Sequence, residues 1–371
     1  MKSLGIYVHI PFCVQRCLYC DFCSFANAED SLASEYVDEL CRRIEAQADT
    51  MADSLVNTVY FGGGTPTLLT EDHLARIMEA IRRSCRPSED CEITCECNPA
   101  TADLAKLRAL RGLGVNRISI GLQSVHDDEL RRLGRIHSYE DFLATFRDAR
   151  EAGFDNISVD LMYALPEQSL AAFEDSLETV ARLAPEHISV YGLKIEEGTP
   201  FDRMRERLIL PDEDEELAMY LACTQVLERH GYHKYEISNF SKPGRESRHN
   251  LRYWRGEEYL GFGVAAYSYF AGARFGNSRD ISAFLRGETI VEDEEHLNDS
   301  DLRSEYLMLR LRLAEGIDPT EFEERFGVSL RSVAPSLDAW IGAGLMKESE
   351  GRVAFTDRGF FVSNAILSEL L

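Results

Sequence analysis

The sequence has no apolar run that approaches the roughly twenty residues needed to span a bilayer. It also has no charged-then-apolar leader ahead of its first cysteine, Cys13. Basic residues are in deficit, because 40 Lys and Arg stand against 64 Asp and Glu, a formal net charge of −24. Nucleic acids and anionic lipids require a broad basic surface, so this charge argues against both as extended partners. We therefore expect a cytoplasmic protein that binds no nucleic acid.

The length and composition predict a folded protein with two cores. A chain of 371 residues has room for a barrel-sized domain and a smaller one, and 44% hydrophobic residues can fill both. Ten cysteines occur in a chain without a leader. We expect them to be metal ligands and reduced core thiols rather than disulfides.

Four of the cysteines lie in the stretch YVHIPFCVQRCLYCDFCSF, residues 7–25. Cys13, Cys17 and Cys20 have C-x3-C-x2-C spacing, and Cys23 follows three residues later. Three cysteines can bind three irons of a [4Fe–4S] cluster, which leaves the fourth iron open to another ligand. The alternatives are a zinc knuckle, a disulfide-rich segment and a ferredoxin-like cluster. Zinc sites favour paired C-x2-C units and ferredoxins space their cysteines differently, so we favour the open cluster.

Strand-like and helical segments alternate up to residue 201. The expected strands are GIYVHIPF, LVNTVYF, EITCECNP, RISIGLQS, NISVDLMYALP and HISVYGLKIEEGTPF. The expected helices cover residues 31–50 with Asp30 or Ser31 as the cap, 70 or 71 to 85, 104–113, 139–152 and 170–183. This alternation predicts an α/β fold with a parallel sheet. Six units are fewer than the eight of a closed barrel, so we predict a partial (β/α)6 TIM-like barrel.

Polar side chains alternate with apolar ones along three of the expected strands. Because successive side chains of a strand point to opposite faces, each polar set shares one face. These sets are Thr94 with Glu96, then Arg117, Ser119, Gly121 and Gln123, then Ser158 with Asp160. Parallel strands in an all-apolar core would be apolar on both faces, so the barrel interior should be wetted and bind a polar ligand. Cys91, Cys95 and Cys97 are expected to pack in the core instead.

The cysteine spacing, with aromatic Tyr19 just before the last ligand, resembles the radical S-adenosylmethionine (radical SAM) superfamily. In that superfamily the open iron chelates the amino and carboxylate groups of the methionine moiety. The reduced cluster then cleaves S-adenosylmethionine to methionine and a 5′-deoxyadenosyl radical. Over essentially its whole length the chain further resembles the oxygen-independent coproporphyrinogen III oxidases and the related haem chaperones.

This resemblance implies a set of cofactor-binding residues. Gly62, Gly63 and Gly64 would meet the methionine amino group, where the absence of a Cβ allows close approach. The methionine carboxylate and amine and the ribose hydroxyls of S-adenosylmethionine would be held by Glu96, Gln123, Arg135 and Asp160. Its adenine would be bordered by Tyr19 and Tyr191. Tyr7 and Thr65 complete the expected set, and Cys13, Cys17 and Cys20 would bind the cluster.

Two features resemble the haem-chaperone branch of this family. Phe22 occupies the position where the oxidases carry a fourth cysteine, so Cys23 is expected to be a structural thiol. The segment HNLRYW, residues 249–254, is similar to the HNxxYW signature of the branch. Imidazole binds haem iron in many proteins, so His249 is a candidate haem ligand. The alternative is that His249 and Asn250 bond to loop backbone.

Some positions depart from the family pattern. Ala266-Tyr267-Ser268 stands where related chains often have Ala-His-Ser, which removes a histidine that could lie near the site. Ala164 and Glu167 stand where glycines are often found after the Asp160 strand.

We expect three domains: a radical SAM partial barrel at 1–205, an extension with HNLRYW at 206–296, and a small winged-helix-like domain at 297–371. In the last, helices at 304–313, 319–326 and 330–343 precede a hairpin and a helix at 359–371. Residues 301–371 contain eight Lys and Arg against twelve Asp and Glu, so DNA binding by this module is not expected.

The resemblance implies a haem chaperone that binds a [4Fe–4S] cluster, S-adenosylmethionine and haem and delivers haem to haemoproteins such as respiratory enzymes. An electron donor such as flavodoxin would be a partner, and peripheral contact with a membrane partner stays open. The alternative is an oxygen-independent coproporphyrinogen III oxidase, whose radical abstracts hydrogen from propionate side chains. Its dehydrogenase activity is not expected, because the oxidases carry an extension ahead of the cluster loop and here twelve residues precede Cys13. Intact cysteines argue against a degraded, purely structural barrel.

Overall fold

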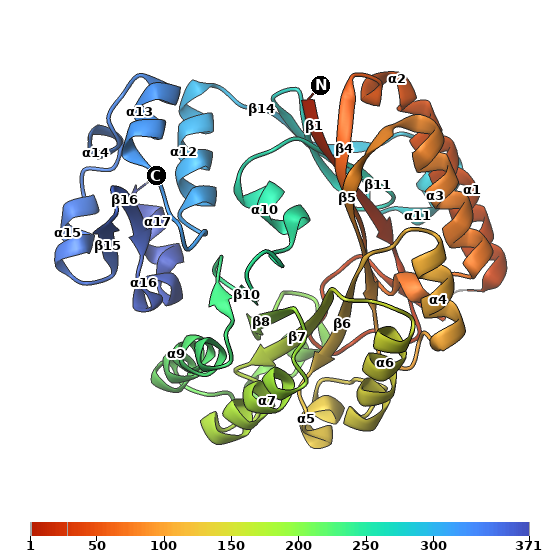
Figure 1. Ribbon diagram of the computed structural model, residues 1–371, viewed down its shortest axis with the longest axis horizontal. Coiled ribbons are helices and arrows are strands. Elements are labelled where there is room, and N and C mark those ends of the chain that lie inside the picture. The colour runs from red at the N-terminus through yellow and green to blue at the C-terminus, as the bar shows by residue number, and fades with distance from the viewer. Residues whose placement is uncertain (1, 28, 371) are drawn as a thin grey trace.

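The computed structural model describes residues 2–27 and 29–370 (Figure 1). Its strands are β1 (Lys2–Ile10), β2 (Phe12–Cys13), β3 (Phe25–Ala26), β4 (Ser54–Gly63), β5 (Arg86–Cys97), β6 (Arg117–Gln123), β7 (Ile157–Tyr163), β8 (His187–Gly192), β9 (His233–Lys234), β10 (Asn239–Ser241), β11 (Tyr259–Phe262), β12 (Tyr267–Phe270), β13 (Ala273–Asn277), β14 (Val291–His296), β15 (Met346–Ser349) and β16 (Arg352–Phe355).

Its helices are α1 (Asp30–Ala46), α2 (Ala48–Met51), α3 (Glu71–Ser84), α4 (Leu104–Gly112), α5 (Asp127–Arg132), α6 (Tyr139–Glu151), α7 (Leu170–Arg182), α8 (Pro200–Arg203), α9 (Glu213–Arg229), α10 (Arg248–Trp254), α11 (Ile281–Leu285), α12 (Asp299–Arg310), α13 (Pro319–Phe326), α14 (Leu330–Val333), α15 (Leu337–Gly342), α16 (Asp357–Phe361) and α17 (Ser363–Leu370). Short 3-10 turns occur at Pro66–Leu68 and Arg205–Arg207. No helix among the described residues combines the length and hydropathy that a membrane span requires.

A 12-stranded sheet organises most of the chain, in the order β14-β13-β12-β11-β1-β4-β5-β6-β7-β8-β10-β9. The strands from β11 to β8 in this order are parallel, and those at the two edges are antiparallel. Helices α1, α3, α4, α6 and α7 cover the outside of the curved sheet, and α10 lies on its inner side (Figure 1). The predicted α/β partial barrel, with its six successive parallel strands, is confirmed.

Residues 206–296 extend the barrel sheet at both edges. Strands β9 and β10 continue it beyond β8, and β11 pairs in parallel with β1, with Gly5 opposite Tyr259. The sequence pattern did not predict β11, because this strand is only four residues long and contains a glycine. The assignment of 206–296 as a separate domain stays a prediction.

Four of the expected helices have other bounds in the structure. The first helix is capped by Glu29, not Asp30 or Ser31, and the helical geometry breaks at Gln47, which separates α1 from α2. Helix α12 starts at Asp299, ahead of the predicted residue 304, because Asn298 and Asp301 form a capping box. Pro335 follows Ala334 and divides the predicted helix 330–343 into α14 and α15. The predicted last helix, 359–371, is two helices, α16 and α17, because the helical geometry breaks at Val362, and Leu371 lies outside the described residues.

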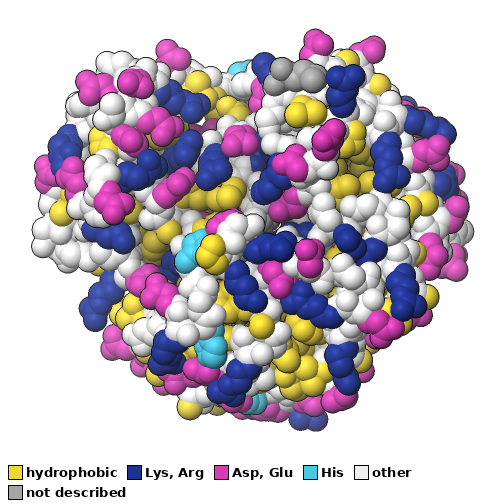
Figure 2. Space-filling model, viewed as in Figure 1, with side chains coloured by type: hydrophobic (Ala, Val, Ile, Leu, Met, Phe, Trp, Pro, Cys, Tyr) yellow, Lys and Arg dark blue, Asp and Glu magenta, His cyan; other side chains and the backbone are white. Residues whose placement is uncertain are grey.

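The C-terminal segment has its own core. Helices α12 to α17 and the β15–β16 hairpin enclose a buried cluster that includes Leu307, Phe322, Val353 and Phe360. This arrangement of helices and one hairpin is the winged-helix-like unit that the sequence predicted. Lys234 connects it to the barrel, since its ammonium lies 2.6 Å from a carboxylate oxygen of Asp357. Acidic and basic side chains are mixed on the face shown in Figure 2.

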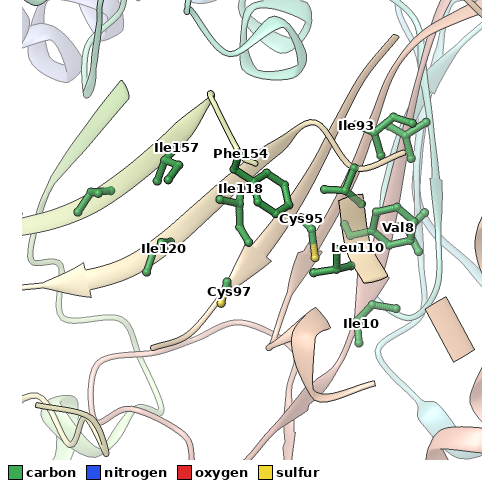
Figure 3. Packing of buried hydrophobic residues seen from close by; sticks show 14 of the residues in the cluster. Val8, Ile10, Ile93, Cys95, Cys97, Leu110, Ile118, Ile120, Phe154 and Ile157 are labelled. Carbon is green, nitrogen blue, oxygen red and sulfur yellow. The ribbon is translucent and has the colours of Figure 1, made fainter. Parts of the chain in front are cut away.

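The outward faces of the parallel strands form the main core (Figure 3). Ile118 and Ile120 of β6 are fully buried there, while Arg117 and Ser119, which alternate with them, face the barrel interior. Cys95 and Cys97 are 0% and 2% exposed, and Figure 3 shows both among the apolar side chains of this core. Their predicted role as packing residues is confirmed.

Helix α10 is fixed inside the barrel by a buried arginine, Arg252, which is 1% exposed. Its guanidinium donates to the carbonyl oxygen of Glu258 at 2.8 Å and to the hydroxyl of Ser3 at 2.7 Å. It also bonds to the side chain of Asn57, and it forms an ion pair with Glu257 at 3.3 Å. The residue therefore ties α10 to β1 and β4.

We expect Arg252→Met to lower the free energy of unfolding by about 3 kcal/mol, because it leaves several buried acceptors without partners. Urea unfolding followed by circular dichroism measures this change. The control is Arg255→Met at the C-cap of the same helix, whose partly exposed guanidinium lies 3.7 Å from Glu315. That variant should lose less than about 1 kcal/mol. Equal losses for the two variants would contradict the anchoring role of Arg252.

Candidate functional site

The cluster loop, residues 11–24, leaves the carboxyl end of β1 and is closed at its base by pairing of β2 with β3. The N–H of Leu18 donates to the carbonyl of Leu133 at 2.9 Å, and the carbonyl of Leu18 accepts from Phe201 at 3.0 Å. Cys13, Cys17 and Cys20 are free thiols of intermediate burial on this loop. The loop is thus held from two other parts of the barrel, with its thiols still accessible.

All three thiols line one cavity of about 380 Å³ inside the barrel mouth. The other walls come from the strands, from the loops that follow them and from α10. The polar residues and glycines of these walls are Tyr60, Gly63, Gly64, Glu96, Asn98, Arg117, Ser119, Gly121, Gln123, Arg135, Asp160, Ser189, Tyr191 and Asn250. Loop and strands therefore combine soft sulfur ligands with a polar chamber.

The three loop thiols do not form a preassembled site for a single metal ion. Burial raises the pKa of Cys20 to about 11 and also raises that of Cys13, so each thiol needs a cation to become a thiolate. A guanidinium nitrogen of Arg135 lies 3.4 Å from the sulfur of Cys17. Among the described residues no three His, Cys, Asp or Glu converge on one ion, as a closed zinc site requires. A [4Fe–4S] cluster is larger than a single metal ion, so cysteines that bind it lie farther apart.

Cys23 does not line the cavity, although its neighbours Phe22 and Ser24 do. Its sulfur lies 3.9 Å from the carbonyl oxygen of Arg279, and burial raises the pKa of this thiol. Its own carbonyl accepts a hydrogen bond of 2.8 Å from Nε2 of His9. This geometry agrees with the structural role that the sequence predicted for Cys23.

Glu96 of β5 and Asp160 of β7 each place a carboxyl group in the cavity, with β6 between their strands. Burial raises the pKa of Glu96 to about 7, against the opposing effect of the Tyr60 hydroxyl, which donates to Oε1 at 2.8 Å. The N–H of Gly63 donates to Oε2 of Glu96 at 3.1 Å. Burial also raises the pKa of Asp160, whose Oδ1 accepts from Ser119 at 3.2 Å. Near neutral pH a cationic ligand would therefore favour the ionised form of Glu96.

Gln123 and Arg135 shape the wall nearest the cluster loop. Gln123 has a φ of +77°, a region that costs a non-glycine residue strain and is found at functional sites. Arg135 follows α5 and donates to the side chain of Asn98 at 2.7 Å and to the carbonyl of Gly121 at 2.6 Å. These bonds and its contact with Cys17 fix the guanidinium between the loop and the strands.

The glycines of GGGTP are required by the protein's own packing. A Cβ on Gly64 would lie 2.7 Å from the carbonyl oxygen of Phe12, and one on Gly62 would lie 2.8 Å from the Tyr60 ring. Gly63 and Gly64 line the cavity, whereas Gly62 does not. The turn thus exposes its backbone to the cavity at Gly63 and Gly64, two of the three predicted positions.

Tyr7 and Thr65 lie behind the cavity wall. The Tyr7 hydroxyl is 3.0 Å from Nδ1 of His9, and its ring stacks on Tyr60. The Thr65 hydroxyl donates to the sulfur of Cys13 at 3.7 Å and accepts from Asn98 at 2.6 Å. The structure brings Tyr19 and Tyr191 to the cavity but not these two residues.

The HNLRYW motif forms α10, and its residues face different ways. His249 is 1% exposed, with Nδ1 2.9 Å from the Thr58 hydroxyl and Nε2 2.8 Å from the Tyr253 hydroxyl. Burial lowers the pKa of His249 to about 3. Asn250, the next residue, is the one that lines the cavity. In this geometry His249 could bind iron only after its hydrogen bonds break, which supports a structural role; the haem-ligand role stays a prediction.

The positions that depart from the family pattern do not line the cavity. Ala164 and Glu167 have φ values of +59° and +60°, so the loop after β7 keeps a glycine-like conformation with non-glycine residues. Tyr267, in the place of the expected histidine, is 45% exposed and donates its hydroxyl to Asp293 at 2.8 Å.

Sequence reasoning missed several residues that line the cavity. Tyr60 alternates with the apolar residues of β4 and could have been found by the same period-two pattern. Ser189 is likewise on the inner face of β8, opposite Asp160 of β7. No sequence signal identified Asn98, and the HNLRYW motif contained Asn250 without indicating that it lines the cavity, since loop and helix packing bring both residues to the site.

Comparisons with known proteins agree with this architecture. Residues 7–180 match the Radical SAM superfamily, and residues 297–362 match the HemN C-terminal domain. The structure is similar to that of coproporphyrinogen III oxidase (HemN) from Escherichia coli, with a TM-score of 0.87 and 24% identity, covering 100% of this chain and 90% of that one. This likeness shows the fold: a radical SAM α/β fold with a HemN-type C-terminal domain.

Full-length relatives are more similar in sequence. The chain is 38% identical to a Bacillus subtilis protein named heme chaperone HemW, covering 100% of this chain and 99% of the relative. It is 34% identical to the Escherichia coli protein of the same name, again covering 100% and 99%. A mitochondrial radical S-adenosyl methionine domain-containing protein 1 from Danio rerio is 34% identical over 86% of this chain and 75% of its own length. The chain therefore belongs to the HemW family of the radical SAM superfamily.

Proposed function

We propose that this chain is a haem chaperone that binds a [4Fe–4S] cluster, S-adenosylmethionine and haem, and delivers haem to haem-accepting proteins. The observation that carries the proposal is its full-length similarity to relatives named heme chaperone HemW. The site supports it, because three loop thiols face a polar cavity that can take a charged small molecule.

The residues of the cavity suit the groups of S-adenosylmethionine. Cys13, Cys17 and Cys20 would bind the cluster, which when reduced supplies one electron to the bound sulfonium. Arg135 would hold the methionine carboxylate, since a guanidinium donates parallel hydrogen bonds. The carboxyl group of Glu96 would receive the amino group. Asp160 and Gln123 would take the ribose hydroxyls, with Tyr19 and Tyr191 beside adenine and the backbone at Gly63 and Gly64 near the methionine.

Haem would meet the mouth of this cavity. Phe22 lines the cavity yet is 62% exposed, so its ring offers an apolar face to a flat macrocycle. Respiratory haemoproteins would receive the haem, and a flavodoxin-like protein would supply electrons. We further propose a cytoplasmic location, with peripheral contact to a membrane partner where the acceptor lies in a membrane.

The proposal is tested on anaerobically reconstituted protein with dithionite and S-adenosylmethionine, given haem in one sample and coproporphyrinogen III in another. We expect stoichiometric haem uptake by absorbance, transfer to an apo-haemoprotein, and no protoporphyrinogen on chromatography. Formation of protoporphyrinogen would instead make the chain an oxidase.

We expect Cys17→Ser to lose the cluster and leave the fold intact, because the barrel strands do not depend on the loop sulfur. Iron and sulfide content and visible absorbance measure the cluster, and circular dichroism measures the fold. Cys23→Ser is the matched control and should keep the cluster, since Cys23 lies outside the cavity. Retained cluster absorbance in Cys17→Ser would refute the ligand assignment.

His249→Ala distinguishes the two roles of His249. From its buried hydrogen bonds we expect the free energy of unfolding to fall by about 1–3 kcal/mol and haem affinity to change little. Haem titration and urea unfolding of the same variant measure both quantities. A large loss of haem affinity and a shifted haem spectrum, with cluster content unchanged, would establish His249 as a haem ligand.

A further inference from the structure

The cavity contains a buried cation with no bonding partner, Arg117. Its side chain is 2% exposed, and its guanidinium lines the cavity. Its Nε has no hydrogen-bond partner, and within residues 2–27 and 29–370 no hydrogen bond or ion pair involves its side chain. Burying an unpaired charge is costly, and such groups in folded proteins are normally paired or bind a ligand.

The other buried arginines of this region are hydrogen-bonded through their terminal nitrogens, although their Nε atoms, like that of Arg117, have no partner. Arg252, the other large and fully buried arginine, makes hydrogen bonds to Ser3, Asn57 and Glu258. Arg135 bonds to Asn98, Gly121 and Cys17. Each guanidinium offers five N–H donors, and of these three arginines only Arg117 makes no hydrogen bond with any of them within the described residues. The unpaired charge is therefore a property of this position and not of buried arginines in this fold.

Arg117 also lies far from the cluster loop. It is the first residue of β6, and Gly121, which accepts from Arg135, is four residues farther along the same strand. At the rise of a strand this separates the two positions by roughly 13 Å. Arg135 thus reaches the thiols, whereas the backbone of Arg117 lies at the amino end of β6, away from them. Asn250 of α10 lines the same cavity, and its side-chain amide makes no hydrogen bond within the described residues.

We propose that Arg117 binds a ligand carboxylate at the end of the cavity away from the cluster, with the amide of Asn250 as a second donor in the wall. One guanidinium balances one charge, and the nearby carboxyl groups of Glu96 and Asp160 disfavour a phosphate dianion. The planar fork of arginine matches a carboxylate. The site rests on the geometry of Arg117 alone; its assignment to a tetrapyrrole propionate rests on the proposed function. The other source of a carboxylate is the methionine moiety of S-adenosylmethionine.

The test compares haem with haem dimethyl ester, which lacks free carboxylates, on the reconstituted protein and on Arg117→Gln. We expect Arg117→Gln to weaken haem binding roughly ten- to hundredfold, as for loss of a hydrogen bond to a charged group. The ester should bind the protein and the variant equally, and S-adenosylmethionine affinity should not change. The control is Arg131→Gln on α5, an exposed arginine, which should alter none of these affinities.

Each result decides the proposal. Weaker S-adenosylmethionine binding by Arg117→Gln with unchanged haem binding overturns the proposal, because the methionine carboxylate belongs at the cluster end of the cavity, beside Arg135. Unchanged affinity for both ligands overturns it. If Arg117→Gln does not fold, Arg117→Lys replaces it, and equal affinity of the unaltered protein for haem and its ester overturns the propionate assignment. If the protein binds no haem, the proposed function fails, and the S-adenosylmethionine titration alone decides the role of Arg117.

Discussion

The structure depends on the alternation of side chains along its parallel strands. One face of each strand packs apolar residues such as Ile118 and Ile120 against the outer helices, so the other face is free to carry polar groups. Because the sheet curves without closing, those inward faces meet around a cavity instead of filling it. The stability of the barrel and the chemistry of its interior thus come from opposite sides of the same strands.

The loops at the carboxyl ends of the strands add the chemistry that strands cannot supply. The thiols reach the cavity because the cluster loop is hydrogen-bonded to residues Leu133 and Phe201, which belong to distant parts of the chain. Arg135 then joins loop and strands by contacts with Cys17 and Gly121. The same cavity is lined by two carboxyl groups and three arginines; Arg16 and Arg135 are hydrogen-bonded, and Arg117 is not.

Period-two and helical patterns in the sequence were sufficient to predict the six barrel strands and the inward faces with Glu96, Ser119 and Asp160. They could not place residues whose position depends on tertiary packing. The HNLRYW motif drew attention to His249, yet the turn of α10 buries that ring and points Asn250 to the cavity. The sequence likewise cannot show that Arg117 lacks a hydrogen-bond partner, because this depends on whether neighbouring elements place an acceptor beside its guanidinium.

The central claim is that the three loop thiols hold a cluster whose open iron faces the polar cavity. The most direct measurement is the electron paramagnetic resonance spectrum of the reduced, reconstituted protein before and after addition of S-adenosylmethionine. The account predicts a changed spectrum of the cluster, because the ligand binds the open iron. A cluster spectrum that does not respond to S-adenosylmethionine would contradict it.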